Sequence, residues 1–427
     1  MFFKTTDAHE ALRAKVRQFA ENEVKPIAFL LDQQNEFPDE AVKKLAELGL
    51  MGIPYPKEYG GAGLDVLSYA IAVEELSRVD GGTGVILSAH VSLGSWPIFA
   101  YGTEEQKQKY LVPLVKGEKI GAFGLTEPNA GSDAGGTETT AVLKGDHYVL
   151  NGGKIFITNA PKADTYVVFA VTTPDIGTRG ISAFIVEKGW KGFEFGDHYD
   201  KMGIRSSSTA ELIFNDVKVP RENLLGKEGD GFKIAMSTLD GGRIGIASQA
   251  LGIAQGAYEN ALEYARERIQ FGKPVGFQQA ISFKLADMAT KLRCARMLVY
   301  SAAELKEHHE SYAMEAAMAK MYASDIALEV TNDAMQIYGA IFRIPLSGIH
   351  GSLAAFGVSF PTLVLMLLCV LALLAADWFI HNRKLPQKLN NTLVLRYAVY
   401  FILIAVMLLF GSYGDGYDPQ DFVYFQF

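Results

Sequence analysis

Apolar residues recur at helical spacing through residues 1–118. The first series is Leu12, Val16, Phe19 and Val24. Thr6 and Asp7 precede it as candidate N-cap residues, and Pro38 with its two acidic neighbours opens a second helix that ends at Gly49. A third series, Ala70, Val73 and Leu76, precedes the glycine-rich segment 80–82. These patterns predict a helical N-terminal domain over residues 1–118.

The spacing changes to short β-rich runs after residue 118. Residues 148–150 and 154–158 flank the turn sequence Asn151-Gly152-Gly153, which predicts a β-hairpin. Further strands are predicted at residues 165–171, 181–186 and 210–219. We therefore expect a small β-domain over residues 119–225.

Helical spacing returns in three long stretches, which are residues 231–268, 277–307 and 311–338. Three long neighbouring helices imply a bundle, assigned to residues 226–339. The order of helical, β and helical segments predicts an α+β fold, because the strands and helices do not alternate as βαβ units do.

The composition changes again after Gly339. Residues 351–376 and 397–414 contain no charged residue and are long enough to be candidate membrane spans. The basic segment 381–388 lies between them, which predicts a transmembrane hairpin with its loop in the cytoplasm. A pair of buried helices in a water-soluble protein is the alternative. Residues 340–427 are therefore predicted to be a hydrophobic tail that contacts a membrane through residues 351–414.

Charge and cysteine content exclude several classes of protein. The formal net charge is −8, so the chain has no basic footprint for nucleic acid. The two cysteines, Cys294 and Cys369, lie far apart, which excludes a disulfide framework and gives no metal-ligand spacing. The first residues do not resemble a signal peptide. We expect residues 1–339 to be cytoplasmic and to bind no metal.

One loop carries residues suited to ligand binding. Phe123–Asp133 combines small residues, whose backbone amides can approach a ligand closely, with the hydroxyls of Thr126 and Ser132. By residue chemistry alone, an ordinary polar loop is the more common explanation. The chain has no G-x-G-x-x-G motif after a strand, so a Rossmann dinucleotide site is not supported.

The same loop resembles the T-E-P-x-A-G-S-D signature of acyl-CoA dehydrogenases. Three further segments match that family in order: 154–159 (KIFITN), 266–274 (RERIQFGKP) and 336–339 (QIYG). Residues 239–243 (LDGGR) resemble the short-chain, butyryl-CoA branch. The resemblance covers residues 1–339, about four-fifths of the chain. It implies FAD as cofactor, short-chain acyl-CoA as substrate and an electron-transferring flavoprotein as electron acceptor.

The resemblance also assigns roles to individual residues. Those implied to surround the isoalloxazine of FAD are Phe123, Leu125, Thr126, Ser132, Phe156, Ile157 and Thr158. Those implied to contact the adenosine diphosphate portion from a neighbouring subunit are Arg268, Phe271, Gln279, Gln336 and Gly339. Ser132, Asp240 and Arg243 would hold coenzyme A. A homo-oligomer, dimer or tetramer, follows from the shared site. Without the resemblance, Phe156 would be a hairpin core residue and Arg268 part of a solvated helix end.

The residue expected to act as catalytic base is missing. The family uses a glutamate that follows the third bundle helix, but here Gly339 is followed by the unrelated sequence 340–345. A second branch of the family places the base at the position of Gly242. Asp240 is nearby in sequence, but it matches a coenzyme A position. Because general-base catalysis contributes about 10²–10⁴-fold, we expect little or no turnover.

The tail suggests a fusion of unrelated sequences. Residues 421–427 resemble the C-terminal end of membrane-bound O-acyltransferases, so residues 340–427 make the chain an apparent chimera. Three alternatives to a dehydrogenase remain open: a non-catalytic, membrane-tethered protein that binds flavin or acyl-CoA, a fragment of a membrane O-acyltransferase, and a chain that forms no stable protein.

Overall fold

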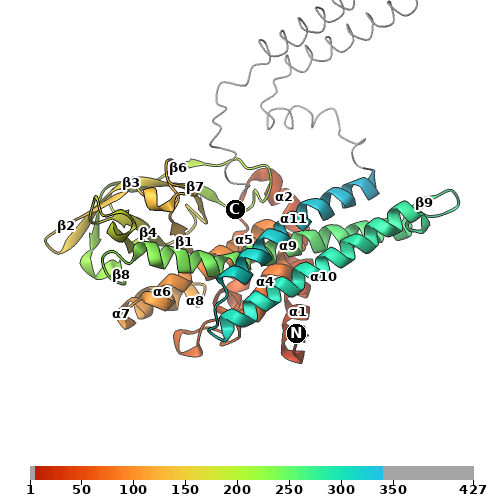
Figure 1. Ribbon diagram of the computed structural model, residues 1–427, viewed down its shortest axis with the longest axis horizontal. Helices are drawn as coiled ribbons and strands as arrows, with labels where there is room; N and C mark the ends of the chain where they lie inside the picture. The colour runs from red at the N-terminus through yellow and green to blue at the C-terminus, as the bar shows by residue number, and fades with distance from the viewer. Residues whose placement is uncertain (1–4, 340–427) are drawn as a thin grey trace, which may run out of the picture. The chain divides into compact units, whose positions relative to one another are not determined.

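The computed structural model describes residues 5–339, which form a helical segment, a β-sheet and a second helical segment in chain order (Figure 1). The predicted α+β fold is confirmed for these residues. The predicted hydrophobic tail 340–427, with its candidate membrane spans, lies outside the described residues.

The N-terminal segment is built from helices and short helical turns. Its α-helices are α1 (Asp7–Phe19), α2 (Lys25–Gln34), α3 (Asp39–Glu47), α4 (Val66–Ser77), α5 (Gly81–Ala89), α6 (Trp96–Tyr101), α7 (Glu104–Gln106) and α8 (Val112–Val115). Thr6 caps α1 as predicted, because its hydroxyl accepts a hydrogen bond from the His9 amide while the His9 ring accepts one from the Thr6 amide. Asp80 caps α5 through the amides of Gly82 and Thr83.

The sequence patterns did not predict the helix that starts at Gly81. It continues from α5 through the π-helical stretch His90–Ser95 into α6. Among residues 5–339, Gly81–Tyr101 is the helix long and apolar enough to cross a membrane, but 78% of its most apolar window is buried inside the protein. It is surrounded by other elements, so its apolar residues show no one-sided pattern.

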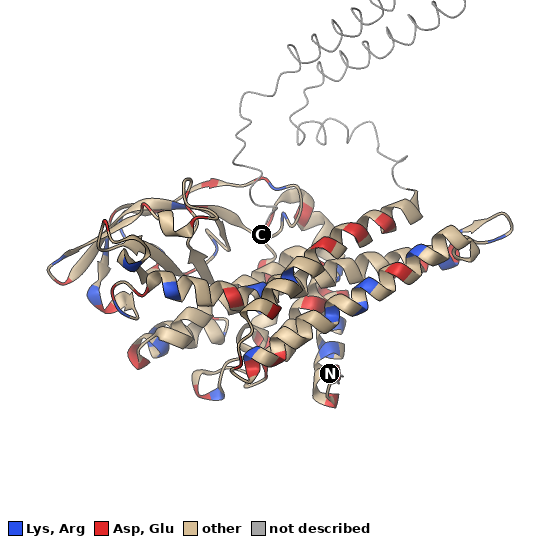
Figure 2. Cartoon of the chain, in the orientation of Figure 1, with Lys and Arg blue, Asp and Glu red and all other residues tan. Residues whose placement is uncertain are grey.

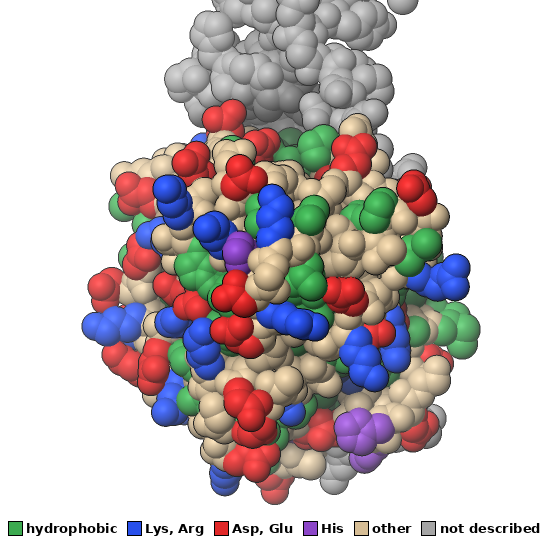
Figure 3. Space-filling view, turned by 90° about the vertical axis from the view of Figure 1, so that its left-hand side faces the viewer, with side chains coloured by type: hydrophobic (Ala, Val, Ile, Leu, Met, Phe, Trp, Pro, Cys, Tyr) green, Lys and Arg blue, Asp and Glu red, His purple; other side chains and the backbone are tan. Residues whose placement is uncertain are grey.

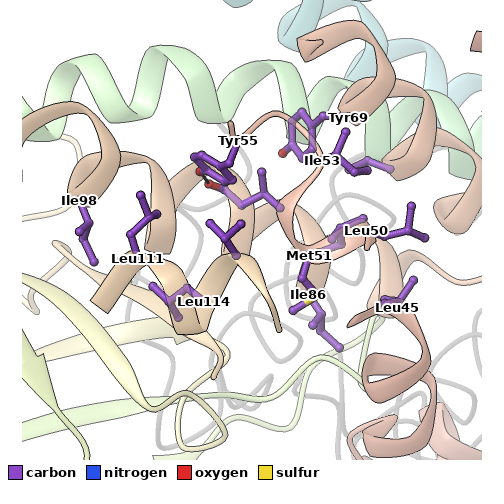
Figure 4. Close-up of a cluster of buried hydrophobic side chains, with 14 of the residues drawn as sticks. Leu45, Leu50, Met51, Ile53, Tyr55, Tyr69, Ile86, Ile98, Leu111 and Leu114 are labelled. Atoms are coloured by element: carbon purple, nitrogen blue, oxygen red, sulfur yellow. Dashed lines mark hydrogen bonds between the residues drawn. The ribbon is translucent and has the colours of Figure 1, made fainter. Parts of the chain in front are cut away.

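The main apolar core of the N-terminal segment lies around this helix. Figure 4 shows buried side chains from several segments meeting there: Leu45, Leu50, Met51, Ile53, Tyr55, Tyr69, Ile86, Ile98, Leu111 and Leu114. The Tyr55 hydroxyl, which is buried, donates to the carbonyl of Val91 at 2.5 Å. The polar end of this aromatic residue is therefore satisfied inside the core.

The middle segment is an eight-stranded sheet in the order β6-β7-β3-β2-β4-β5-β8, with β1 paired to β4. The strands are β1 (Gly121–Gly124), β2 (Thr140–Lys144), β3 (His147–Thr158), β4 (Thr165–Val171), β5 (Ile181–Glu187), β6 (Phe193–His198), β7 (Thr209–Pro220) and β8 (Leu224–Leu225). The predictions for residues 165–171, 181–186 and 210–219 are confirmed.

The predicted hairpin at residues 151–153 is wrong. Strand β3 runs straight through Asn151-Gly152-Gly153 and pairs with β7 on both sides of them. The pairing shifts register between Leu150 and Gly152, and Gly152 has φ +136°, a conformation that glycine adopts readily. The glycines therefore serve a β-bulge, while the hairpin partner of β3 is β2.

The last described segment is a bundle of three long helices, as predicted. They are α9 (Gly231–Glu267), α10 (Gln279–Glu307) and α11 (Ala313–Tyr338). A small hairpin, β9 (Ile269–Gln270) and β10 (Lys273–Pro274), joins α9 to α10, and Figure 1 shows it at the end of the bundle farthest from the sheet. Its two turn residues, Phe271 and Gly272, both have positive φ, as a type I′ turn requires.

Hydrogen bonds to a buried carboxylate connect the bundle to the N-terminal helices. Glu74 of α4 is buried and accepts hydrogen bonds from Arg296 at 2.6 Å and from the Tyr300 hydroxyl at 2.7 Å, both on α10. Elsewhere, acidic side chains predominate along α11 and basic ones along α10 (Figure 2). Acidic and basic side chains are interspersed over the face seen in Figure 3, so that face carries no large field of one sign.

Candidate functional site

The fold brings together the two segments assigned to the isoalloxazine. The loop after β1 runs alongside β3, and the Ile155 amide donates to the Thr126 carbonyl at 2.9 Å. Phe123 lies in β1 and packs edge-on against Phe169, with ring centroids 5.0 Å apart. Leu125 and Ile157 are buried beneath the two segments. The structure therefore places these sequence-predicted residues in one region of the sheet.

Two hydroxyls in this region have no intramolecular partner. Thr126 and Thr158 are half-buried, and within residues 5–339 neither hydroxyl makes a hydrogen bond. Ser132 is exposed on the same loop. Partly shielded hydroxyls that are not used by the protein can serve a ligand, so the donor and acceptor set fits a flavin ring.

Phe156 has an unusual backbone conformation. Its φ is +59°, in the left-handed region that non-glycine residues seldom adopt, and β3 shifts register against β7 between Lys154 and Ile157. Its ring packs against Tyr199 with centroids 4.8 Å apart. Residues held in such conformations cluster at ligand sites, so this backbone geometry agrees with the predicted place of Phe156 at the cofactor.

An ion pair that the sequence analysis missed lies directly under these segments. The Lys154 ammonium is fully buried and donates to Glu127 Oε1 at 2.5 Å and to the Leu125 carbonyl at 3.1 Å. Burial lowers the pKa of Lys154 to about 8, so the side chain keeps its proton at neutral pH. Burial acts to raise the pKa of Glu127, but Lys154 and hydrogen bonds from Glu138 and Thr139 outweigh it, and that pKa is lowered.

Of the three residues assigned to the substrate, Asp240 and Arg243 lie in the first third of α9, and Ser132 is exposed on the loop after β1. Asp240 and Arg243 form an ion pair with each other one helical turn apart. Gly242 is buried between them, and a Cβ built on it would lie 2.8 Å from Leu93 Cδ2. The position of the alternative base therefore has no free space for a side chain unless Leu93 moves.

The residues assigned to a neighbouring subunit lie at the far end of the bundle. Arg268 ends α9, Phe271 forms the β9–β10 turn with 92% of its surface exposed, and Gln279 begins α10. Gln336 and Gly339 are exposed at the end of α11, where Tyr338 stacks on Tyr264 of α9 with centroids 4.4 Å apart. Figure 1 shows this end of the bundle and the sheet at opposite sides of the described part of the chain.

Of the buried pair Lys154–Glu127 and the contact between Leu93 and Gly242, only Glu127 has a signal in the sequence. Glu127 belongs to the recognised loop motif, but Lys154 is a residue type that is usually exposed, and only the pairing of β3 with the loop shows that it is buried. The contact between Leu93 and Gly242 joins residues about 150 positions apart, and no local pattern signals such an approach.

Family models match three parts of the chain. The model of the acyl-CoA dehydrogenase N-terminal domain matches residues 6–118, that of the middle domain matches residues 122–217, and that of the C-terminal domain matches residues 229–341. These ranges end at residue 341, so the O-acyltransferase resemblance of the tail stays a prediction.

Relatives and solved structures agree with these matches. The chain is 60% identical over 339 residues to a short-chain-specific acyl-CoA dehydrogenase of Clostridium acetobutylicum, covering 79% of this chain and 89% of the relative. A structure of butyryl-CoA dehydrogenase from Megasphaera elsdenii aligns with a TM-score of 0.79 and 50% identity, over 82% of this chain and 93% of the other.

A further similar chain belongs to a structure described as the electron transferring flavoprotein of Acidaminococcus fermentans. It aligns with a TM-score of 0.79 and 58% identity, over 80% of this chain and 90% of that one. Fold, motif residues and relatives agree, and the chain belongs to the acyl-CoA dehydrogenase family of FAD-dependent oxidoreductases that act on CH–CH bonds.

Proposed function

We propose that residues 5–339 bind FAD and a short-chain acyl-CoA, and that the chain turns over slowly because it lacks a catalytic base. The family reaction converts acyl-CoA to trans-2-enoyl-CoA, with electrons passing to an electron-transferring flavoprotein. Short-chain-specific and butyryl-CoA relatives at 50–60% identity support this substrate class. Low turnover is expected because neither family position for the base holds a carboxylate. Gly242, which is buried, occupies one position, and the sequence after Gly339 lacks the glutamate segment of the other.

The two lining segments would hold the flavin ring. The free hydroxyls of Thr126 and Thr158 would hydrogen-bond to it, and Phe156 would cover one face. When bound, FAD supplies the acceptor for the β-hydrogen, which leaves the substrate as hydride. The segments also exclude water on their buried side, where Leu125 and Ile157 lie.

Helix α9 provides two of the residues that would bind the substrate. Arg243 and Asp240 would contact coenzyme A, and their mutual ion pair holds the guanidinium in place before the substrate arrives. The α-proton of the thioester then needs a base. Residues 340–427 contain no glutamate, so this segment after α11 offers none for that role.

The first experiment measures the flavin directly. The full chain, purified in detergent and loaded with FAD, is mixed anaerobically with butyryl-CoA while the flavin absorbance is followed. We expect substrate binding to perturb the spectrum, with bleaching slower than in a complete relative by about 10²–10⁴-fold. Bleaching at the relative's rate would contradict the proposal, because it would require a base outside the two family positions.

A gain-of-function variant also tests whether the missing catalytic base limits turnover. Gly242→Glu places a carboxylate at the alternative base position, and Leu93→Ala removes the methyl that would lie 2.8 Å from its Cβ. We expect the double variant to bleach faster with butyryl-CoA than the parent chain does, by at least about tenfold. Gly242→Gln with Leu93→Ala is the matched control, since it has the same shape without a base.

The separation of the two groups of flavin residues favours a shared site. Arg268, Phe271, Gln279, Gln336 and Gly339 lie at the end of the bundle that carries β9, and Figure 1 shows that end on the opposite side of the described residues from the sheet, which supports a site formed by two chains. We therefore propose a homo-oligomer, dimer or tetramer, in which each FAD contacts two chains. Membrane contact through residues 351–414 and the chimeric origin of the tail stay predictions from the sequence.

A further inference from the structure

We propose that Lys154 and Glu127 are positioning residues that hold the two flavin-lining segments at a fixed separation. The inference rests on the proposed FAD site, and it concerns the protein side of that site. Neither charged group is assigned to the flavin, because both are buried under the segments.

The lysine joins both segments through one ammonium group. Lys154 belongs to β3, two residues before Phe156, and its Nζ donates to the carbonyl of Leu125 and the carboxylate of Glu127 on the loop. The Ile155 amide adds a third contact to the Thr126 carbonyl at 2.9 Å. The loop is thus fixed to β3 at three successive residues, Leu125, Thr126 and Glu127.

The glutamate orders the rest of the loop. One of its oxygens accepts a hydrogen bond from the Glu138 amide at 2.6 Å, and the other accepts one from the Thr139 amide at 3.1 Å. Glu127 and Ala130 also exchange two backbone hydrogen bonds of 3.1 Å, which close a tight turn. The carboxylate therefore connects the loop, the segment leading into β2, and β3.

The pair lies where β3 leaves regular geometry. Its register against β7 shifts between Lys154 and Ile157, and Phe156 has its left-handed φ inside that shift. Such conformations persist only when surrounding contacts enforce them. Lys154 fixes the strand at the residue where the irregular stretch begins.

Stability alone does not account for this pair. A buried ion pair often adds little to folding stability, because desolvation offsets the attraction between the charges. A buried ammonium with two well-placed acceptors does, however, restrict the loop to one arrangement. We therefore assign the pair a role in site geometry.

The test compares Lys154→Met with a control variant, Arg296→Met, which breaks the part-buried pair between Arg296 of α10 and the buried Glu74 of α4. FAD dissociation constants are measured on deflavinated full chain by flavin fluorescence, well below each variant's unfolding temperature. We expect Lys154→Met to raise the constant by about tenfold or more, equivalent to about 1.4 kcal/mol, and Arg296→Met to leave it nearly unchanged. Equal effects of the two variants would overturn the proposal.

Hydrogen exchange on the flavin-free chain separates this inference from the proposed function. We expect Lys154→Met to speed exchange of the Glu138, Thr139 and Ile155 amides, while Arg296→Met does not. If the parent chain binds no FAD but these amides respond, the proposed function fails and the positioning role stands. If they exchange at the parent rate in Lys154→Met, the positioning role is refuted.

Discussion

Acidification is expected to destabilise the protein through one buried histidine. His90 is completely buried; its Nε2 donates to the Leu114 carbonyl at 3.0 Å and its Nδ1 accepts from the Gly121 amide at 3.0 Å. Burial lowers the pKa of His90 to about 4, since the charged ring would lose its hydration there. Protonation would also remove the acceptor for Gly121, the first residue of β1.

The direction in which the free energy of unfolding changes with pH follows from the pKa of His90 in the folded and unfolded states. The unfolded histidine takes up its proton near pH 6.5 and the folded one near pH 4, so the unfolded state binds more protons between these values. The full stabilisation is present above pH 6.5 and is lost as the pH falls toward 4. A difference of about 2.5 pKa units, at about 1.4 kcal/mol per unit, amounts to about 3.5 kcal/mol. About 2 kcal/mol of this is lost between pH 7 and pH 5.

The assay is urea unfolding of the full chain at pH 7 and pH 5, followed by tryptophan fluorescence. His90→Gln does not titrate, so the loss of unfolding free energy on acidification should shrink by about 2 kcal/mol relative to the parent. The exposed His308 provides the control His308→Gln, which should keep the parent's pH dependence. If parent and His90→Gln lose the same free energy between the two pH values, His90 does not carry the acid sensitivity.

Two further predictions follow from the geometry. Phe156→Ala and Arg268→Ala should each weaken FAD binding. When the two variants are mixed, one of the two sites in each mixed dimer combines a native Phe156 with a native Arg268. Since about half of the dimers are mixed, about a quarter of the sites should bind FAD tightly again. Fluorescence titration of the remixed sample measures this, and no recovery would refute the shared site. Gly256→Ala should destabilise the chain by about 2 kcal/mol, because its Cβ would lie 2.0 Å from the Arg78 carbonyl oxygen, although alanine favours helices. A higher midpoint in thermal unfolding would contradict that packing argument.

The bundle helices and, in the N-terminal segment, α1, α3 and the buried α4 could be predicted from apolar spacing and caps, whereas the helix that starts at Gly81 could not. The caps at Thr6 and the long helices of the bundle have clear local signals. The helix starting at Gly81 lies inside the protein, so its composition carries no helical period. The glycines at 152 and 153 have the composition of a turn, yet pairing with β7 keeps them in a strand. For both the helix at Gly81 and the glycines of β3, contacts with residues distant in sequence determine the secondary structure.

The site was predictable to the extent that the family motif includes its residues. Thr126, Phe156 and Thr158 were identified by resemblance, and the structure brings their segments together. The contacts that shape the site come from residues with no motif, such as Leu93 opposite Gly242. Their effect depends on packing between elements, which spacing along one segment does not report.

The length of α9 has a consequence for insertions and deletions. This helix of 37 residues carries Asp240 and Arg243 near its start and Arg268 at its end, so Gly242 and the helix end are about 38 Å apart along the axis. Adding one residue between them would move the end by about 1.5 Å and rotate it by about 100°. Related chains that share this site should therefore vary in the composition of α9 but keep its number of residues.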